Sequence, residues 1–151
     1  MFTWDNFLDF RDGPSLDVGF NGFSTPENGF IWQVGRFGEV IFDFESPSRC
    51  GTPEAELIVE LDAYCGAPRE AGQNVLVYLN GYRLGSVLLT RSRVLLRRFD
   101  WHLLRRKGNV LTLDAPDAAR PTSPGTQDTR VLGARLLSLQ FRPAPPDPRA
   151  G

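Results

Sequence analysis

The dipeptide Asn80-Gly81 constrains the fold more than any other feature of this sequence. It separates residues 74–79 (NVLVYL) from residues 82–89 (YRLGSVLL), two runs that are mainly apolar. Asn-Gly is the strongest short signal for a type I′ turn, because both central residues of that turn need a positive φ angle. The sequence therefore predicts a tight β-hairpin over residues 74–89.

Other segments repeat the two-residue period of a β-strand. Residues 56–61 (ELIVEL) place three aliphatic side chains on one face, and we expect Glu56 and Glu60 to point outward from the other face. Residues 39–44 alternate in the same way. Apolar runs predict further strands at 30–34, 94–99, 110–113 and 131–141. We expect loops before residue 30 and a long polar loop over residues 114–129.

Turn-forming residues are frequent, with 15 Gly and 12 Pro in 151 residues, and no helical period or internal repeat is sustained. Seven or eight short antiparallel strands joined by long loops are typical of an all-β fold, an antiparallel β-sandwich of the jelly-roll type. We interpret residues 1–142 as a single β-sandwich domain. Residues 143–151 form a Pro-rich tail that we expect not to extend a sheet.

Charge is distributed unevenly along the chain. Residues 1–62 hold 12 acidic and 3 basic side chains, whereas residues 63–151 hold 6 acidic and 14 basic ones. Neither half has enough strand signals for a sandwich of its own. We therefore expect the two halves to interleave in one domain and to neutralise each other.

Signals for catalysis are weak. His102 is the only histidine, it follows a strand, and we expect a surface or packing role for it. The chain has no Gly-rich phosphate-binding loop, although its many carboxylates leave glycoside hydrolysis open. Seven basic residues lie between positions 91 and 107, on both sides of Phe99 and Trp101 in the sequence. They would suit binding of single-stranded nucleic acid, binding of an anionic polysaccharide, or neutralisation of the acidic half of the chain. We favour neutralisation, and we predict neither an enzyme nor a nucleic-acid partner.

Three further features bear on location and cofactors. Asp5, Asp9 and Asp12 would suit a structural calcium ion, but their spacing is not that of an EF-hand loop, so we favour a solvated acidic segment. Cys50 and Cys65 are expected to be reduced thiols rather than a disulfide. The first ten residues do not resemble a secretory signal, and no run is apolar enough to insert in a membrane. We therefore expect synthesis in the cytosol.

Aromatic residues are the better lead to function. A sugar ring stacks its C–H face on Trp or Tyr while nearby polar groups bind its hydroxyls. Trp32 lies within a predicted strand and suits a core role better, whereas Tyr82 and Trp101 lie nearer to loops. The other candidates are Trp4, Tyr64 and Tyr78. Exposed apolar residues at a terminus usually find a partner chain, so residues 1–20, with Phe2, Trp4 and Phe7, and the Pro-rich tail are candidate docking segments.

Three stretches in sequence resemble a known group of proteins. They are residues 22–27 (GFSTPE) followed by Trp32 and Gly35, residues 73–75 (QNV) leading to Asn80-Gly81, and residues 123–125 (SPG) followed by residues 128–133 (DTRVLG). In this order they resemble the carbohydrate-binding-like jelly-roll domains of bacterial polysaccharide glycosyltransferases. They are also similar to the head-spike proteins of alphaproteobacterial gene transfer agents. The resemblance covers about residues 20–141.

The resemblance implies a β-sandwich that binds capsular polysaccharide. For a free-standing chain it implies an attachment subunit of a phage-like particle, assembled in the cytosol with other spike subunits and released with the particle. Alternatives are a structural particle subunit that binds protein only and an accessory module of a glycosyltransferase. The matched residues also admit structural roles: an ion pair between Glu27 and Arg130, a turn at Asp128, and loop support. The candidate carbohydrate-binding residues are Glu27, Trp32, Gln73, Asn80, Tyr82, Trp101, Asp128 and Arg130.

Overall fold

The computed structural model describes residues 1–12, 17–27, 29–63, 72–118 and 131–146. Within these ranges the regular elements are β-strands and two short 3-10 turns. The strands are β1 (Phe7–Asp9), β2 (Gly19–Asn21), β3 (Ile31–Val34), β4 (Phe37–Phe42), β5 (Glu54–Asp62), β6 (Gln73–Leu79), β7 (Tyr82–Leu89), β8 (Arg93–Asp100), β9 (Asn109–Asp114) and β10 (Leu132–Pro143). The turns are η1 (Pro47–Cys50) and η3 (Trp101–Leu103).

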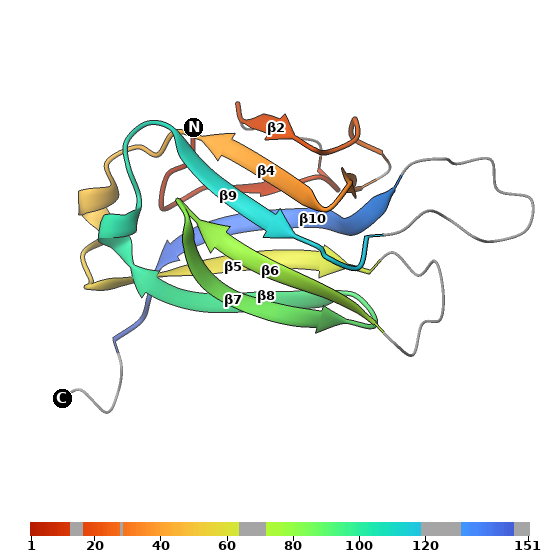
Figure 1. The fold of residues 1–151 in the computed structure, drawn as a ribbon. Coiled ribbons are helices and arrows are strands. Elements are labelled where there is room, and N and C mark those ends of the chain that lie inside the picture. The colour runs from red at the N-terminus through yellow and green to blue at the C-terminus, as the bar shows by residue number, and fades with distance from the viewer. Residues whose placement is uncertain (13–16, 28, 64–71, 119–130, 147–151) are drawn as a thin grey trace, which may run out of the picture.

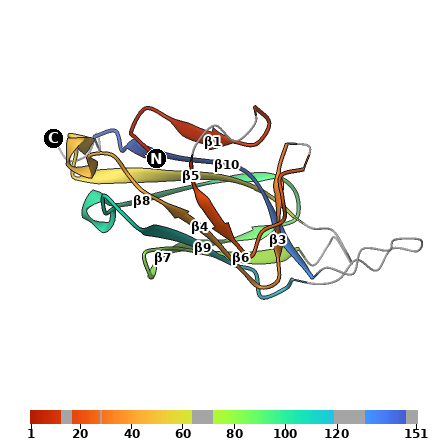
Figure 2. The ribbon, with the colours of Figure 1, turned by 90° about the horizontal axis from the view of Figure 1, so that it is seen from above.

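The strands form two antiparallel sheets packed face to face. One sheet has the order β1-β10-β5-β8, and β3 also pairs with β10. The other has the order β2-β4-β9-β6-β7. Figure 2 shows the two layers edge on, with the η1 and η3 turns at one end of the sandwich. This arrangement confirms the predicted antiparallel β-sandwich of the jelly-roll type.

The predicted hairpin is β6 and β7. Leu79 pairs with Tyr82, and the two residues between them have positive φ angles, 50° at Asn80 and 85° at Gly81. A glycine at the second position adopts this conformation without steric cost. The hairpin predicted from Asn80-Gly81 is therefore confirmed, and it forms one edge of its sheet (Figure 1).

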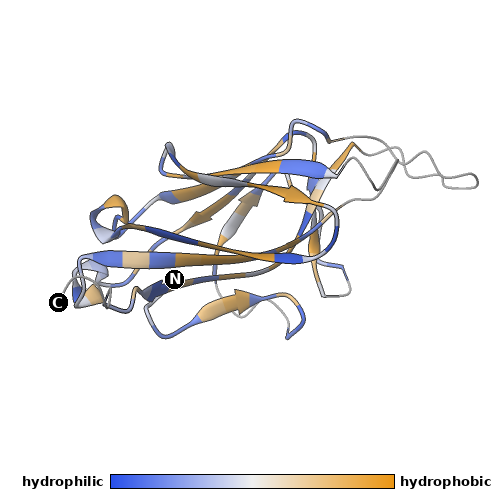
Figure 3. Cartoon of the chain, turned by 90° about the horizontal axis from the view of Figure 1, so that it is seen from below, coloured by the Kyte–Doolittle hydropathy of each residue, from blue (hydrophilic) through white to orange (hydrophobic). Residues whose placement is uncertain are grey.

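The core lies between the sheets and is rich in phenylalanine. Figure 3 shows where apolar and polar residues lie along the strands, and burial alternates along β5 in one sheet and β6 in the other, so that each sheet turns one apolar face inward. The rings of Phe2, Phe42 and Phe141 meet at centroid distances of 5.0, 5.2 and 5.5 Å. Phe44 and Phe99 complete this aromatic cluster against Phe141.

Two strands escaped the sequence prediction. The segment before residue 30 was expected to form loops, yet it contributes β1 and β2, each of three residues. β1 is held by pairing with β10, and β2 by pairing with β4. The expectation that the tail from residue 143 does not extend a sheet is wrong at its first residue, because Pro143 ends β10 and pairs with Ala55. Short edge strands depend on their neighbours in space rather than on a local pattern.

The N-terminal segment is part of the fold. Phe2 is fully buried, and its backbone bonds to Asp43 and Glu45 beside β4. The expectation that Phe2 is exposed for docking is therefore wrong, because its ring fills the core. Trp4 is half-buried against Phe44, and Phe7 keeps 46% of its surface exposed.

Charged residues from the two halves of the chain meet on the outer face of β5. Glu56 binds Arg142 at 2.6 Å and lies 3.8 Å from Arg98, and Asp62 pairs with Arg135. The predicted neutralisation between the halves is confirmed at these pairs. Glu56 lies on the outer face as expected, but it is only 3% exposed because the two arginines cover it.

Candidate functional site

The candidate residues from the sequence do not form one site. β6 begins at Gln73 and ends just before Asn80, so roughly 20 Å of extended strand separates these two residues. Trp32 lies on β3, which pairs with the first residues of β10. Figure 2 shows β3 at the end of the sandwich where β6 begins, and Gln73 is the first residue of β6. Asn80 bonds to the carbonyl oxygen of Leu103 in η3, which places the hairpin tip beside Trp101 at the other end. Asp128 and Arg130 lie outside the described residues.

At the first end, an arginine covers the aromatic candidate. Trp32 points outward from β3, and the guanidinium carbon of Arg135 lies 5.2 Å from the centre of its ring and 4.9 Å from that of Phe30. Arg135 also pairs with Asp62. A sugar stacking on this face of Trp32 would have to displace Arg135. Glu27 is exposed and forms a bridge with Phe30 ahead of β3, whereas Gln73 is only 3% exposed.

At the second end, Asn80 is fully engaged within the protein. Its Nδ2 donates to the carbonyl oxygen of Leu103 at 2.7 Å and to Asn109 Oδ1 at 3.0 Å, and its Oδ1 accepts from the Val110 amide at 2.8 Å. A sugar contact by Asn80 would have to replace one of these bonds. Tyr82, by contrast, is 62% exposed at the base of the hairpin turn.

The backbone at Ser46 marks this second end as unusual. Among the described residues other than glycine, only Ser46 and Asn80 have left-handed φ angles, and Asn80 needs its angle for the hairpin. Ser46 precedes η1 with a φ of 49°, and its side chain makes no capping hydrogen bond there. Such conformations persist where the surroundings enforce them, and they gather at functional sites. Two cavities meet at this serine.

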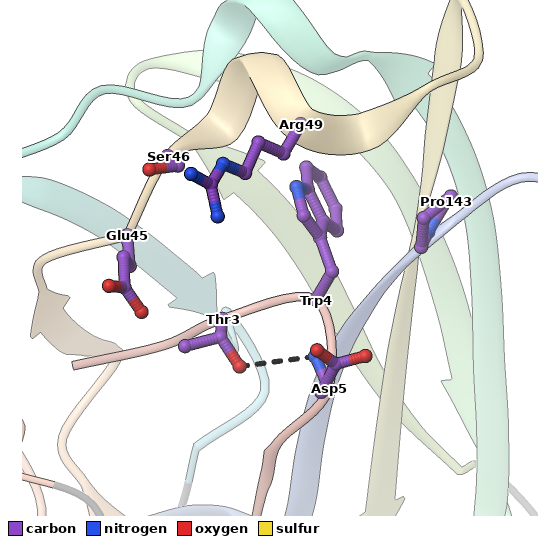
Figure 4. A pocket seen from close by; sticks show the side chains of 7 residues that line it. All are labelled: Thr3, Trp4, Asp5, Glu45, Ser46, Arg49 and Pro143. Carbon is purple, nitrogen blue, oxygen red and sulfur yellow. Dashed lines mark hydrogen bonds between the residues drawn. The ribbon is translucent and has the colours of Figure 1, made fainter.

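The first cavity has a volume of about 380 Å³ and lies between the N-terminal segment and η1 (Figure 4). Trp4 forms one wall and packs against Phe44, with ring centres 4.6 Å apart. In Figure 4 Arg49 reaches from η1 toward the same space as the indole nitrogen of Trp4. The full lining is Thr3, Trp4, Asp5, Glu45, Ser46, Arg49 and Pro143.

Hydrogen-bonding groups around this first cavity lack partners within the described part of the chain. The indole Nε1 of Trp4 is buried and donates to no acceptor. The structure gives no ion pair or side-chain hydrogen bond to the guanidinium of Arg49 or to the carboxylates of Asp5 and Glu45. The cavity therefore presents donors and acceptors that stay free for a ligand.

The second cavity has a volume of about 350 Å³ and is lined by Ser46, Pro47, Ser48, Trp101, Leu104 and Arg106. Trp101 stacks on His102 with ring centres 3.8 Å apart and planes 20° apart. Asp100 fixes this turn, because its Oδ1 accepts from the His102 amide at 2.9 Å and lies 2.6 Å from Nδ1 of the ring. The indole of Trp101 is thus held by its neighbours on one side.

The Asp100–His102 contact gives a prediction for titration. The pKa of Asp100 lies below its ordinary value. The hydrogen bond from the His102 backbone N–H lowers it most, and the hydrogen bond to the His102 imidazole lowers it next. Stabilisation by this carboxylate is present above the pKa of the unfolded state and is lost as pH falls through the lower folded value. In His102→Ala, where the amide remains, we expect the Asp100 pKa to rise only part of the way, as measured by carboxyl ¹³C NMR titration. An ordinary pKa in this variant would show that the imidazole dominates.

Other predicted groups are accounted for separately. His102 lies on the surface as predicted, since its side chain is 69% exposed. Asp5 lines the first cavity and Asp9 binds Arg11, and the described ranges hold no group of three or more His, Cys, Asp or Glu side chains placed to bind a metal ion.

Cys50 is a free, buried thiol, whereas Cys65 lies outside the described residues, as does Tyr64. No helix in the described ranges has the length and apolarity needed to span a bilayer.

Sequence reasoning recognised Trp4 and Trp101 as aromatic candidates but not the residues between them. Glu45, Ser46 and Arg49 follow β4 in a segment with no motif. The one available signal is Pro47, since the residue before a proline is steered away from the right-handed helical region. That signal predicts a turn, but not the cavities on its two sides.

Comparison with known proteins finds similarity in fold and none in sequence family. No family model matches it, and no curated protein matches its sequence. A family 35 carbohydrate-binding module from an environmental isolate has a TM-score of 0.51 at 13% identity, over 93% of this chain and 98% of that one. The N-terminal tandem CBM22 domain of Xyn10C from Paenibacillus barcinonensis has a TM-score of 0.52 at 11% identity, over 95% of this chain and 47% of that one. The likeness is one of fold. It confirms the jelly-roll part of the resemblance seen in the sequence.

Proposed function

We propose that this protein is a non-catalytic carbohydrate-binding protein and that the first cavity, beside Trp4, holds a sugar unit. The observation that carries the proposal is the set of unpartnered groups around an indole. A sugar hydroxyl both donates and accepts hydrogen bonds, so it needs partners of both kinds. Arg49 and Trp4 Nε1 supply donors, and the carboxylates of Asp5 and Glu45 supply acceptors.

The proposed site is preorganised. Packing on Phe44 fixes the ring of Trp4, and the η1 turn fixes the backbone that carries Arg49. A ligand therefore meets an indole ring and a backbone that are already fixed, which lowers part of the entropic cost of association, and it orders the exposed side chains of Asp5, Glu45 and Arg49 when it binds. The cavity volume of about 380 Å³ also lies in the range of ordinary ligand sites. The carbohydrate-binding modules of similar fold support the same choice of ligand class.

We further propose that the ligand is a cell-surface polysaccharide and that the protein serves as an attachment subunit of a phage-like particle. The three sequence stretches that resemble gene-transfer-agent head spikes support this role. It includes assembly with other spike subunits after synthesis in the cytosol, and release with the particle.

A structural subunit that binds only protein is the second candidate. It is favoured by exposed apolar side chains on the outer face of the β5 sheet, where Phe7, Val94 and Leu96 are 46%, 62% and 41% exposed. Phe7 and Leu96 lie in one row across this sheet, joined through Gln140 and Ile58. A patch of this kind is typical of a protein contact.

The test is binding of the purified protein to capsulated cells, to acapsular cells and to a glycan array. Trp4→Phe keeps a ring on Phe44 but removes the indole N–H, and Arg49→Gln removes the charged donor. A lost neutral hydrogen bond costs about 0.5–1.5 kcal/mol and one from a charged donor about 1.5–3 kcal/mol, so we expect capsule binding to weaken by roughly two- to tenfold in Trp4→Phe and by roughly tenfold or more in Arg49→Gln. Arg91→Gln is the matched control, because Arg91 lies in the β7–β8 connection at the other end of the sandwich. Equal binding to both cell types, with no bound glycan, would favour the structural subunit.

A further inference from the structure

The two cavities differ in charge. The first is lined by Asp5, Glu45 and Arg49, whereas Arg106 is the one charged side chain among the residues that line the second. Arg105 and Lys107 flank Arg106 in sequence, and all three are exposed. Within the described residues, none of these three side chains forms an ion pair. The second cavity is therefore an aromatic and basic site beside a site of mixed charge.

The loop that carries Arg106 is held at its backbone, while its charged group remains free. The Arg106 carbonyl oxygen accepts from the Phe44 amide at 3.0 Å, and the Arg105 amide donates to Asn109 Oδ1 at 2.8 Å. The carboxylate of Asp43, which follows directly after β4, accepts from the Gly108 amide at 2.9 Å. Arg106 thus stands on a fixed backbone with its guanidinium available to an anion.

From this arrangement we infer that the second cavity binds an acidic sugar unit, with the sugar ring against Trp101 and its carboxylate on Arg106. This inference rests on the proposed function, and it assigns the ligand class as an acidic glycan of at least two units. The unit beside Trp4 is neutral, because the carboxylates of Asp5 and Glu45 outnumber the one cation in the lining, Arg49, and so disfavour a further carboxylate. Ser46, which lines both cavities, lies where the two units join.

Single-stranded nucleic acid fits this surface less well. Such a ligand needs successive aromatic platforms along a continuous basic groove. The second cavity has one aromatic wall, and one side of Trp101 is already stacked on His102. Beyond Ser46 the lining includes Asp5 and Glu45, which would repel backbone phosphates.

The experiment compares a uronate-containing oligosaccharide with the same oligosaccharide after its carboxyl groups are reduced to alcohols. Affinities are measured by calorimetry for the wild type, for Arg106→Gln and for the control Lys107→Gln, which removes the same charge one residue away. We expect the wild type and Lys107→Gln to bind the acidic form at least tenfold more tightly. Arg106→Gln should bind both forms with the affinity that the wild type has for the reduced one.

Each other outcome is informative. Equal wild-type affinity for the two oligosaccharides would overturn the acidic-sugar inference and leave the proposed function standing. Loss of the preference in Lys107→Gln as well as in Arg106→Gln would also overturn it, because a diffuse basic field would then be sufficient. Failure to bind either form, together with an empty glycan array, would overturn the proposed function itself. Binding of oligo(dT) that is lost in Arg106→Gln would assign the cavity to nucleic acid instead.

Discussion

Replacing Phe141 with alanine is expected to lower the free energy of unfolding by about 4 kcal/mol, the middle of the range for the loss of a buried aromatic ring. Phe141 is fully buried in β10, and the rings of Phe2, Phe42, Phe44 and Phe99 surround it at centroid distances of 5.2 to 6.1 Å. Phe2 lies in the N-terminal segment, Phe99 lies in β8, and Phe42 and Phe44 lie together at the end of β4 and just beyond it, so the four neighbours come from three other segments of the chain. They cannot all close on the space that the ring vacates, so a cavity should remain.

Urea denaturation followed by tryptophan fluorescence measures this loss. Phe7→Ala is the matched control, since it removes the same ring from the same sheet at a position that is 46% exposed. We expect it to cost under about 1 kcal/mol. A Phe141→Ala variant that lost no more than Phe7→Ala would contradict the assignment of the aromatic cluster as the centre of the core.

Replacing Asn109 with leucine is expected to cost about 3 kcal/mol, because it removes four hydrogen bonds from a fully buried side chain. Its Nδ2 donates to the carbonyl oxygens of Phe42 and Arg105, and its Oδ1 accepts from the Arg105 amide and from Asn80 Nδ2. Leucine has a similar size, so the cost comes from backbone groups left without partners rather than from a void.

Thermal unfolding monitored by circular dichroism tests this prediction. The control is Asn74→Leu, since the Asn74 side chain is exposed and, among the described residues, its Nδ2 donates to Asp117 alone, at 3.1 Å. Asn109 also anchors Arg105, next to Arg106 of the second cavity. At a temperature where the variant remains folded, Asn109→Leu should therefore weaken the preference for the acidic oligosaccharide, and Asn74→Leu should not. Equal melting temperatures for the two variants would contradict the role of this network.

The sequence predicts the parts of this fold that are encoded locally. The turn at Asn80-Gly81 is encoded by two adjacent residues, and the alternation of apolar and polar residues in β5 lies within nine consecutive residues. The strands β1 and β2 could not be found in the same way, because each has three residues and is defined by a partner distant in sequence. The burial of Phe2 was missed for the same reason, since its core neighbour Phe141 is almost a chain length away.

The candidate site was predictable only in its aromatic residues. Trp4 and Trp101 stand out by type, but the first cavity needs the N-terminal segment and η1 to lie side by side, about forty residues apart in sequence. Trp32 is an equally good candidate by type. It is covered by Arg135 because β3 pairs with β10, a contact that no local pattern reveals. Residue type therefore suggests which side chains bind a ligand, and tertiary pairing decides which of them are accessible.

The position of β10 has a consequence for biosynthesis. This strand lies between β1 and β5 and also pairs with β3, yet it is the last of the described strands to be synthesised. Until residues up to Pro143 have left the ribosome, β1 and β3 have no partner in their sheet, and the aromatic cluster lacks Phe141. The nascent chain therefore exposes unpaired strands and an open apolar layer until β10 has emerged, and chaperones that shield such surfaces should associate with it up to that point.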